Sequence, residues 1–189
     1  MGEELHVYDF DGTLFRSPER PEGWTGKFWW FEPASLDEPC VPVKPPADWW
    51  VGSTVAQAKR SISNPDVWAV LMTGRSDKRF RWRVPELLKM AGLTFDEVHL
   101  APQEGAAEYF KVSILKSILR KYPFIKKVQF WDDNTKNLKL FQATVEAMGL
   151  EVEVHPVQVA AHEPLCTSEG MAVRVAYRWL LRASKAGEG

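Results

Sequence analysis

The stretch Val7-Tyr-Asp9-Phe-Asp11-Gly12-Thr-Leu-Phe15 decides the fold, because two acids follow a buried apolar strand at the point where it meets a glycine turn. Side chains two positions apart on a strand point to the same side, so the carboxylates of Asp9 and Asp11 are expected to face one site. Two neighbouring acids ionise together only at a cost, so either one of them stays protonated or a hard cation such as Mg²⁺ neutralises the pair. Asp-Gly is also a common hairpin signal, so a simple turn is the alternative. An EF-hand loop is excluded, because Arg20 stands where that loop needs a bidentate glutamate.

The composition is that of an ordinary globular protein. The chain has 189 residues, of which 45% are hydrophobic and 26% are charged, enough for one domain with a sizeable core. A net charge of -1 predicts no general attraction to nucleic acid or membrane, and no apolar run is long enough to span a bilayer. Cys40 and Cys166 are too few and too isolated for a disulfide framework or a zinc site, and the first residues predict no secretory signal. We therefore expect a cytoplasmic or other reducing intracellular compartment.

Short apolar runs alternate along the chain with segments of helical periodicity. This alternation predicts an α/β fold: a doubly wound, Rossmann-like, mainly parallel five-stranded sheet with helices on both faces. We expect residues 1–189 to form a single domain. The predicted strands are 5–8, 67–72, 97–100, 127–131 and 152–155, and the predicted helices are 53–63, 77–91, 107–121, 135–148 and, at the C-terminus, 170–184.

Residues 16–50 interrupt the alternation as a Trp-rich insert after the first strand. They carry many prolines, little periodicity and five of the nine tryptophans. A connection of this length without regular structure is typical of a functional loop or a minimal cap. For Trp49 and Trp50 we expect packing in the core, whereas for the other three both base stacking and packing are open. These three are Trp24, Trp29 and Trp30.

Polar residues follow three of the predicted strands, and ligands bind at the carboxyl ends of strands in open α/β sheets. Asp9 and Asp11 follow the first strand, Thr73-Gly74-Arg75 the second and Asp132-Asp133-Asn134 the fourth, while Lys111 lies near the start of a helix. Taken singly, these motifs also fit a turn with a solvated arginine, a helix N-cap and an exposed lysine. Their convergence on one edge of the sheet predicts an active site.

This set of residues suits the hydrolysis of a phosphate ester, which needs a nucleophile, a proton donor and neutralisation of phosphoryl charge. We expect Asp9 to attack phosphorus and Asp11 to be the acid–base partner. Mg²⁺ would be held by these two acids together with Asp132 and Asp133. The expected phosphate-binding groups are Thr73, Gly74 and Lys111.

The same motifs resemble those of the haloacid dehalogenase (HAD) superfamily over about residues 5–155. The resemblance implies a Rossmann-like sheet, Mg²⁺ and an aspartyl-phosphate intermediate, and an acid at Asp11 is typical of the superfamily's phosphatases. Within the superfamily the chain is most similar to the Swiss-army-knife RNA-repair-like HAD domain. The residues that carry this similarity are 11–18, Trp49-Trp50, 71–75, 93–96 and Phe110-Lys111.

One departure from that family follows the fourth strand. The family tends to show Glu-Asp-Arg followed by a histidine, whereas this chain has Asp132-Asp133-Asn134 and then Asn137. The carboxylates are kept, so metal binding is still expected. The roles of Asn134 and Asn137 stay open.

The substrate is the least determined part of the prediction. No separate globular cap is apparent, so an open site could admit a nucleic-acid phosphate end. The basic run 75–83, with Phe80 and Trp82 among its arginines, suits a single-stranded nucleic-acid backbone, but it also fits the solvated face of a helix. For the C-terminal arginines a solvated helix face is the better interpretation; these are Arg174, Arg178 and Arg182. The alternatives are a phosphatase of small phosphate monoesters and a non-catalytic RNA- or protein-binding domain. The possible substrate-binding residues are Arg75, Arg79, Trp29 and Trp30.

Overall fold

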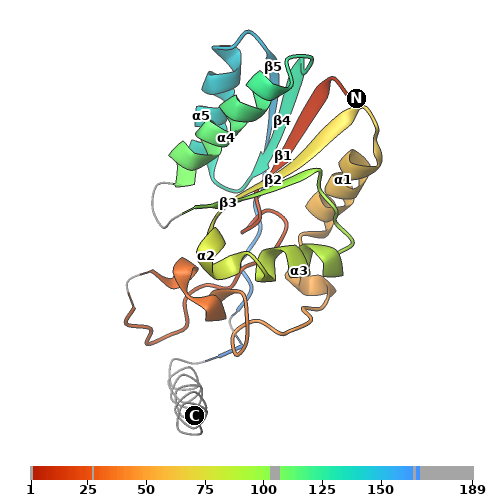
Figure 1. The fold of residues 1–189 in the computed structure, drawn as a ribbon. Coiled ribbons are helices and arrows are strands. Elements are labelled where there is room, and N and C mark those ends of the chain that lie inside the picture. Colours follow the sequence, from red (N-terminus) through yellow and green to blue (C-terminus); the bar gives the residue numbers. More distant parts are fainter. Residues whose placement is uncertain (1, 27, 103–106, 164, 167–189) are drawn as a thin grey trace, which may run out of the picture.

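The structure is a computed structural model that describes residues 2–26, 28–102, 107–163, 165 and 166. Five strands form one sheet in the order β3-β2-β1-β4-β5, and every neighbouring pair is parallel (Figure 1). Tyr8 at the end of the central strand pairs with Leu71 and with Trp131 of its neighbours. The predicted parallel five-stranded sheet is therefore confirmed. The strands are β1 Glu4–Tyr8, β2 Val67–Ser76, β3 Glu97–Ala101, β4 Lys127–Asp132 and β5 Glu151–Pro156.

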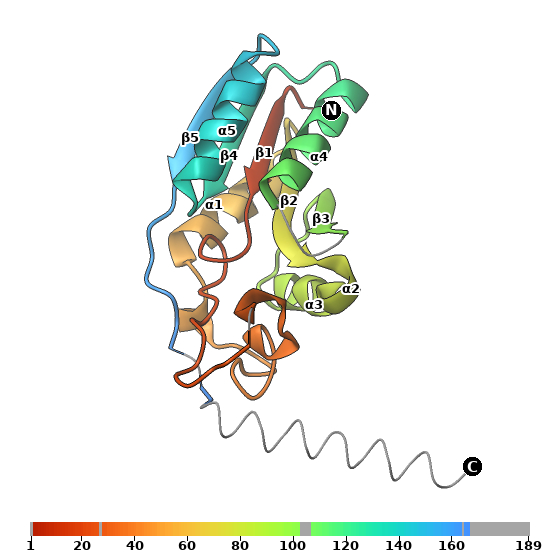
Figure 2. The same ribbon diagram turned by 90° about the vertical axis from the view of Figure 1, so that its left-hand side faces the viewer.

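Helices cover both faces of the sheet, as a doubly wound fold requires (Figures 1 and 2). Along β1 the side chains alternate between two cores: Leu5 and Val7 belong to one, and Tyr8 belongs to the other. The first core is completed by α4 and α5, and the second by α1, α3 and part of the insert. The helices are α1 Gly52–Ser63, α2 Asp77–Phe80, α3 Arg83–Met90, α4 Ala107–Lys121 and α5 Thr135–Glu146.

Two predicted boundaries were wrong. The second strand was expected to end at residue 72, but β2 continues to Ser76 and resumes pairing with Ala101 after an irregularity. The single helix predicted over 77–91 is divided into α2 and α3. Pro85 explains the division, because a proline ring clashes with the carbonyl four residues earlier and is tolerated only in the first turn of a helix. The helix predicted at 170–184 lies outside the described residues.

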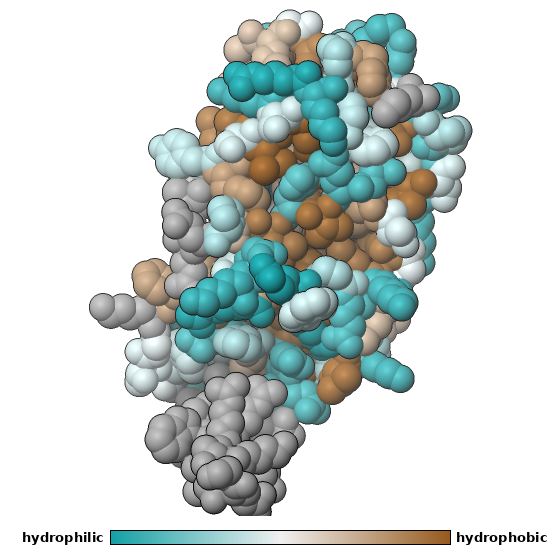
Figure 3. Space-filling model, in the orientation of Figure 1, coloured by the Kyte–Doolittle hydropathy of each residue, from teal (hydrophilic) through white to brown (hydrophobic). Residues whose placement is uncertain are grey.

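One edge of the sheet is formed by β3. Figure 3 shows apolar side chains gathered in the middle of this face of the molecule, in the region where Figure 1 draws β2 and β3. Charged groups lie on the same edge, since Glu97 pairs with His99 at 2.8 Å and accepts a hydrogen bond from Tyr122 at 3.2 Å. Charges on an edge strand discourage pairing with a strand of another chain.

The insert is loop-rich, as predicted, and packs around tryptophans. Among its described residues, 16–26 and 28–50, regular structure is limited to three short 3₁₀ turns. Trp49 is buried against Phe15, and Trp50 packs edge-on against the same ring, so the predicted packing of this pair is confirmed. Trp29 is also buried, and its Nε1 donates to the carbonyl of Pro18 at 2.9 Å. The turns are Trp29–Phe31, Pro33–Ser35 and Ala47–Trp49.

Arg83 fixes the insert onto α3. Its guanidinium is buried and donates to the main-chain carbonyl oxygens of Leu36, Pro42 and Val43 at distances of 2.8, 2.8 and 3.1 Å. Irregular backbone forms no regular main-chain hydrogen bonds that would satisfy its carbonyl oxygens, so the buried guanidinium of Arg83 satisfies them instead. The interpretation of this arginine as part of a solvated helix face was therefore wrong.

A disulfide joins Cys40 of the insert to Cys166, with a Cα–Cα distance of 4.7 Å. Beside it the N–H of Leu165 donates to the carbonyl of Cys40 at 3.1 Å, and the ring of His162 stacks on Trp49 at 3.8 Å. The segment after β5 is thus tied to the insert, and the two run together in Figure 2. Disulfides persist in oxidising surroundings, so this pairing does not support the reducing compartment that the isolated cysteines predicted.

No described helix has both the length and the apolar content that a bilayer span requires.

Candidate active site

The loop after β1 presents Asp9 at the carboxyl end of the sheet. Its N–H continues the strand pairing by donating to the carbonyl of Trp131 at 2.9 Å, and its carboxylate is almost fully buried. The chain then turns on the carbonyl of Phe10, which accepts hydrogen bonds from Leu14 and Phe15 at 3.0 and 2.9 Å. No antiparallel strand follows this turn in the described chain, so the hairpin interpretation was wrong.

Gly12 allows the loop to pass directly over Asp133. Its φ is +66°, and a Cβ on this residue would lie 2.4 Å from Oδ2 of Asp133. A side chain here would meet both the strain of a left-handed backbone and a collision with the carboxylate. The glycine of this loop is therefore needed for the close approach of the loops that carry Asp11 and Asp133.

Gly12→Ala is expected to lower the free energy of unfolding by more than the roughly 1–2 kcal/mol that a left-handed backbone costs. It should also displace the Asp133 carboxylate and so weaken the binding of Mg²⁺. Gly149→Ala is the matched control, because φ is +74° there and no atom lies within 4 Å of the added Cβ. Urea unfolding and Mg²⁺ titration of both variants make the comparison. Equal losses for the two alanines would show that the contact with Asp133 is unimportant.

Lys111 lies between two acids rather than in solvent. Its Nζ donates to Oδ1 of Asp9 at 2.8 Å and to Oδ2 of Asp132 at 3.0 Å, and all three side chains are buried. Burial raises the pKa of Asp9 well above its usual value, and Asp132 adds to this shift while Lys111 opposes it. Burial by itself would lower the pKa of Lys111, but Asp9 and Asp132 outweigh it and the pKa is raised. The lysine is therefore a permanent positive charge inside the site, and its interpretation as an exposed helix residue was wrong.

Three acids converge closely enough to share one cation. Carboxylate oxygens of Asp9, Asp132 and Asp133 lie within 4.8 Å of one another. Desolvation of the Asp133 carboxyl raises its pKa to about 6, and the charges of Asp132 and Asp11 act in the same direction. Such a shift is the sign of acids crowded without enough positive charge around them.

The charge count and the donor atoms both fit Mg²⁺. Asp9, Asp11, Asp132 and Asp133 bring four negative charges, whereas Lys111 and Arg75 bring two positive ones, which leaves a deficit that a single divalent cation would neutralise. Mg²⁺ prefers carboxylate oxygens, and the three converging acids offer them. The residues present here are therefore suited to hold this metal.

Asp11 is oriented away from this group. Its carboxylate accepts hydrogen bonds from Nε of Arg75 at 2.9 and 3.0 Å, from Nη2 at 2.6 Å and from Oγ of Ser17 at 2.5 Å. The prediction that the Asp11 side chain is a metal ligand therefore has no support in this geometry. A fixed position next to Asp9, outside the three-acid group, is what an acid–base partner requires.

Arg75 connects Asp11 to the insert. Its side chain is 2% exposed, and its Nη1 donates to the carbonyl of Trp30 at 2.6 Å and to Oγ of Ser35 at 2.5 Å. The rings of Trp30 and Phe80 lie 5.1 and 5.0 Å from the guanidinium carbon. The interpretation of this residue as a solvated turn arginine was wrong, because every face of the guanidinium is used.

A cavity of about 460 Å³ lies over these acids. Gly74 and Lys111 line it, as do Trp30 and Phe31 from the insert and Val159 and Ala161 from the segment after β5. Trp30 is 45% exposed and so is available to a bound molecule.

Three other predicted site residues lie elsewhere. Thr73 is fully buried, and its hydroxyl oxygen accepts a hydrogen bond from the N–H of Arg75 at 3.1 Å, so it does not line the cavity. Trp29 is packed inside the insert. Arg79 donates to the carbonyl of Phe31 at 2.9 Å, next to the cavity rim.

Several supporting residues were not assigned a role from the sequence. Nδ2 of Asn137 donates to the two oxygens of Asp132 at 3.1 and 3.3 Å, and the N–H of Asn134 donates to the same carboxylate at 2.8 Å. Asn134 also caps α5 by accepting from the N–H of Lys136, so the N-cap interpretation of this motif is confirmed for Asn134. Oγ1 of Thr13 accepts from the N–H of Asp133 at 3.0 Å. These contacts give both asparagines a structural task, the orientation of Asp132.

Comparison with known proteins agrees with this arrangement. The model of HAD domain family 1 in Swiss Army Knife RNA repair proteins matches residues 10–172. An uncharacterized protein of Saccharomyces cerevisiae is 25% identical over 175 residues, which cover 78% of this chain and 38% of the yeast protein. The chain thus spans well under half the length of that relative.

Two solved structures share the fold at low sequence identity. The HAD domain of the effector protein Lem4 from Legionella pneumophila, in an inactive mutant, has a TM-score of 0.52 and 14% identity, with 92% of each chain covered. A chain of the Pnkp1/Rnl/Hen1 RNA repair complex has a TM-score of 0.51 and 12% identity, with 82% of this chain and 42% of that chain covered. Together with the family match, the motifs and the sheet lead to one assignment: this chain belongs to HAD domain family 1 of Swiss Army Knife RNA repair proteins.

Proposed function

We propose that this chain is a Mg²⁺-dependent phosphoric monoester hydrolase that acts through an aspartyl-phosphate on Asp9. The observation that carries the proposal is the convergence of Asp9, Asp132 and Asp133 near Lys111. Asp9, Asp133 and Lys111 line the cavity. Mg²⁺ held by these acids would neutralise charge on the phosphoryl oxygens. A binding domain without catalysis would gain nothing from such crowding, because the repulsion only destabilises the fold.

The residues divide the reaction between them. An oxygen of Asp9 attacks phosphorus and the bond to the leaving oxygen breaks, while Asp11 gives that oxygen its proton. Asp11, now a carboxylate stabilised by Arg75, then takes a proton from water, whose oxygen attacks the phosphorus of the aspartyl-phosphate. The bond between phosphorus and the Asp9 oxygen breaks, which releases inorganic phosphate and restores the Asp9 carboxylate. Lys111 supplies fixed positive charge near the attacking carboxylate throughout.

The proposed substrates are the phosphate ends of nucleic acids. Trp30 at the cavity and the neighbouring Phe28, which is 62% exposed, give unpaired bases an aromatic surface beside the phosphate. Arg79 lies at the same rim. The family is described from RNA repair proteins, and one protein of similar fold comes from an RNA repair complex, which supports this class of substrate.

Removal of the metal is the first test. Phosphate release from oligonucleotides phosphorylated at the 3′ or 5′ end, from an aryl phosphate and from a panel of phosphorylated metabolites should require Mg²⁺, stop in EDTA and resume when Mg²⁺ is restored. We expect the oligonucleotides to have the highest kcat/KM. Turnover that persists in EDTA would contradict the metal-dependent reaction, and turnover of small esters alone would contradict the nucleic-acid substrate.

Trp30→Ala separates substrate binding from chemistry. We expect KM for an oligonucleotide to rise about tenfold, since stacking on an aromatic side chain is worth roughly 1–3 kcal/mol per base, while kcat/KM for the aryl phosphate stays within about twofold. Trp82→Ala is the control, because Trp82 is 82% exposed and does not line the cavity. Equal effects on both substrates would mean that Trp30 only shapes the site.

A further inference from the structure

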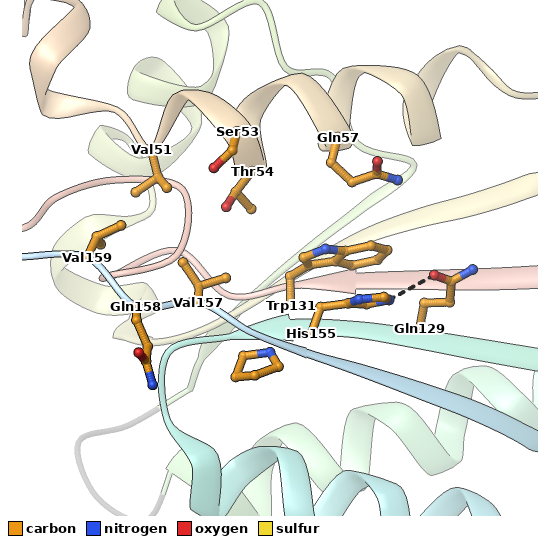
Figure 4. A pocket seen from close by; sticks show the side chains of 11 residues that line it. Val51, Ser53, Thr54, Gln57, Gln129, Trp131, His155, Val157, Gln158 and Val159 are labelled. Atoms are coloured by element: carbon orange, nitrogen blue, oxygen red, sulfur yellow. Dashed lines mark hydrogen bonds between the residues drawn. The ribbon is translucent and has the colours of Figure 1, made fainter.

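A second cavity lies on the face of the sheet that α1 covers. Its volume is about 430 Å³, and it is an open cavity bordered by α1, by β4 and β5 and by residues 157–159 (Figure 4). In Figure 4 the side chains of Ser53 and Thr54 extend from α1 toward the space that Trp131 and Val157 border from the other side. Val159 lines this cavity and also the acidic one, so one segment of chain lies at the boundary of both.

The lining carries no formal charge. None of the described side chains around the cavity has a carboxylate, ammonium or guanidinium group. His155 is the titratable member, and burial lowers its pKa, which favours the neutral imidazole. A charged ligand would lose hydration here without gaining a partner, so an uncharged ligand is favoured.

Two stacked rings, those of Trp131 and His155, line the cavity, and Tyr8 lies behind Trp131 in the same stack. Tyr8, Trp131 and His155 occupy neighbouring positions on β1, β4 and β5, with ring centroids 4.5 and 4.4 Å apart and interplanar angles of 6° and 12°. The stack ends at His155 on the edge strand, where 38% of the side chain is exposed. A further planar ring can extend this stack.

On the opposite wall the side chain of Gln57 accepts hydrogen bonds from Arg60, but other hydrogen-bonding groups have no partner among the described residues. Thr54 is only 5% exposed, and its hydroxyl makes no hydrogen bond with any residue that the structure describes. The first turn of α1 above it has no side-chain cap, so its N–H donors are also available. The hydroxyl can therefore exchange a hydrogen bond with the polar edge of a bound ligand, which is worth about 1 kcal/mol. Gln158 contributes a carboxamide to the same space.

We propose that this cavity binds an uncharged heteroaromatic ring, and specifically a nucleobase. A nucleobase combines flat faces for the aromatic wall with an edge of neutral donors and acceptors for Thr54 and the start of α1. The inference rests on the proposed function only for the class of substrate, because it gives a nucleic-acid phosphatase a place to hold a base close to its acidic cavity.

Binding can be measured without turnover. The full chain carrying Asp9→Asn and labelled with ¹⁵N is titrated with adenosine, guanosine, cytidine and uridine, and with ribose and inorganic phosphate as controls. At least one nucleoside should cause saturable shifts of the Trp131 indole and Thr54 amide signals, and ribose should not. Thr54→Val should weaken that binding about fivefold, the loss of one hydrogen bond, whereas Thr144→Val on the exposed side of α5 should leave it unchanged.

The outcomes separate this inference from the proposed function. Saturable nucleoside binding in a chain that proves to have no phosphatase activity would support the base site and sink the proposed function. Absence of saturation up to about 10 mM nucleoside, or shifts confined to residues of the acidic cavity, would overturn the base site whatever the activity. Thermal melting of Thr54→Val verifies folding, and Ser53→Ala, which changes an exposed hydroxyl of the same cavity, should weaken binding in the same direction.

Discussion

Asp9→Asn is expected to lower kcat for every substrate by about 10⁴-fold, because the amide cannot attack phosphorus and the remaining residues supply only binding and electrostatic stabilisation. The free energy of unfolding should stay the same or rise, since the pKa of Asp9 is raised by burial and by nearby acids and the neutral amide removes this repulsion. Lys111 keeps Asp132 as its partner. A loss of activity without a loss of stability is the result expected when the nucleophile is replaced.

The control for this substitution is Asp66→Asn. Asp66 is exposed in the loop before β2, at the opposite end of the sheet, so neither activity nor stability should change. Both variants are assayed with an aryl phosphate and an oligonucleotide, and their unfolding in urea is followed. Asp9→Asn protein with more than about one per cent of the original kcat would contradict the assignment of the nucleophile.

Arg75→Met is expected to reduce both stability and turnover. The substitution leaves Asp11 with only Ser17, and it removes the donor that Ser35 and the carbonyl of Trp30 share. Loss of one member of a buried ion pair costs about 3 kcal/mol, and a carboxylate displaced by about 1 Å costs about 10²-fold in rate. We therefore expect kcat to fall about 10²-fold under conditions where the variant is still folded.

Two further variants distinguish the positioning of Asp11 from a general loss of structure. Arg75→Lys keeps the charge but cannot reach Asp11 and the insert together, so intermediate values of stability and kcat are expected. Arg60→Met, on the exposed side of α1, should change the free energy of unfolding by less than about 0.5 kcal/mol. If Arg75→Met kept its full kcat while folded, Arg75 would have no part in placing Asp11.

The sheet and the acidic residues were predictable because their signals are local. Each strand is a short apolar run, and the acids stand immediately after β1 and at the end of β4, where a parallel sheet brings such residues together. Lys111 was predicted at the site for the same reason, since its helix begins at the same edge.

The buried arginines and the disulfide could not be predicted in this way. The partners of Arg75 and Arg83 include main-chain carbonyls of an insert without periodicity, and a carbonyl has no signature in the sequence. Cys40 and Cys166 are 126 positions apart, so their pairing depends on how the insert and the last described segment meet. Local patterns identified the acids, and long-range packing decided how they are held.

The direct test of the central claim is a search for phosphate on Asp9 itself. The chain is mixed with Mg²⁺ and excess phosphorylated substrate, quenched in acid within milliseconds, digested and analysed by mass spectrometry. We expect the peptide that contains Asp9 to carry one phosphoryl group, which should be absent when Mg²⁺ is omitted or when Asp9→Asn protein is used. Turnover with no phosphorylated peptide at any quench time, or with the phosphoryl group on a different residue, would contradict the account.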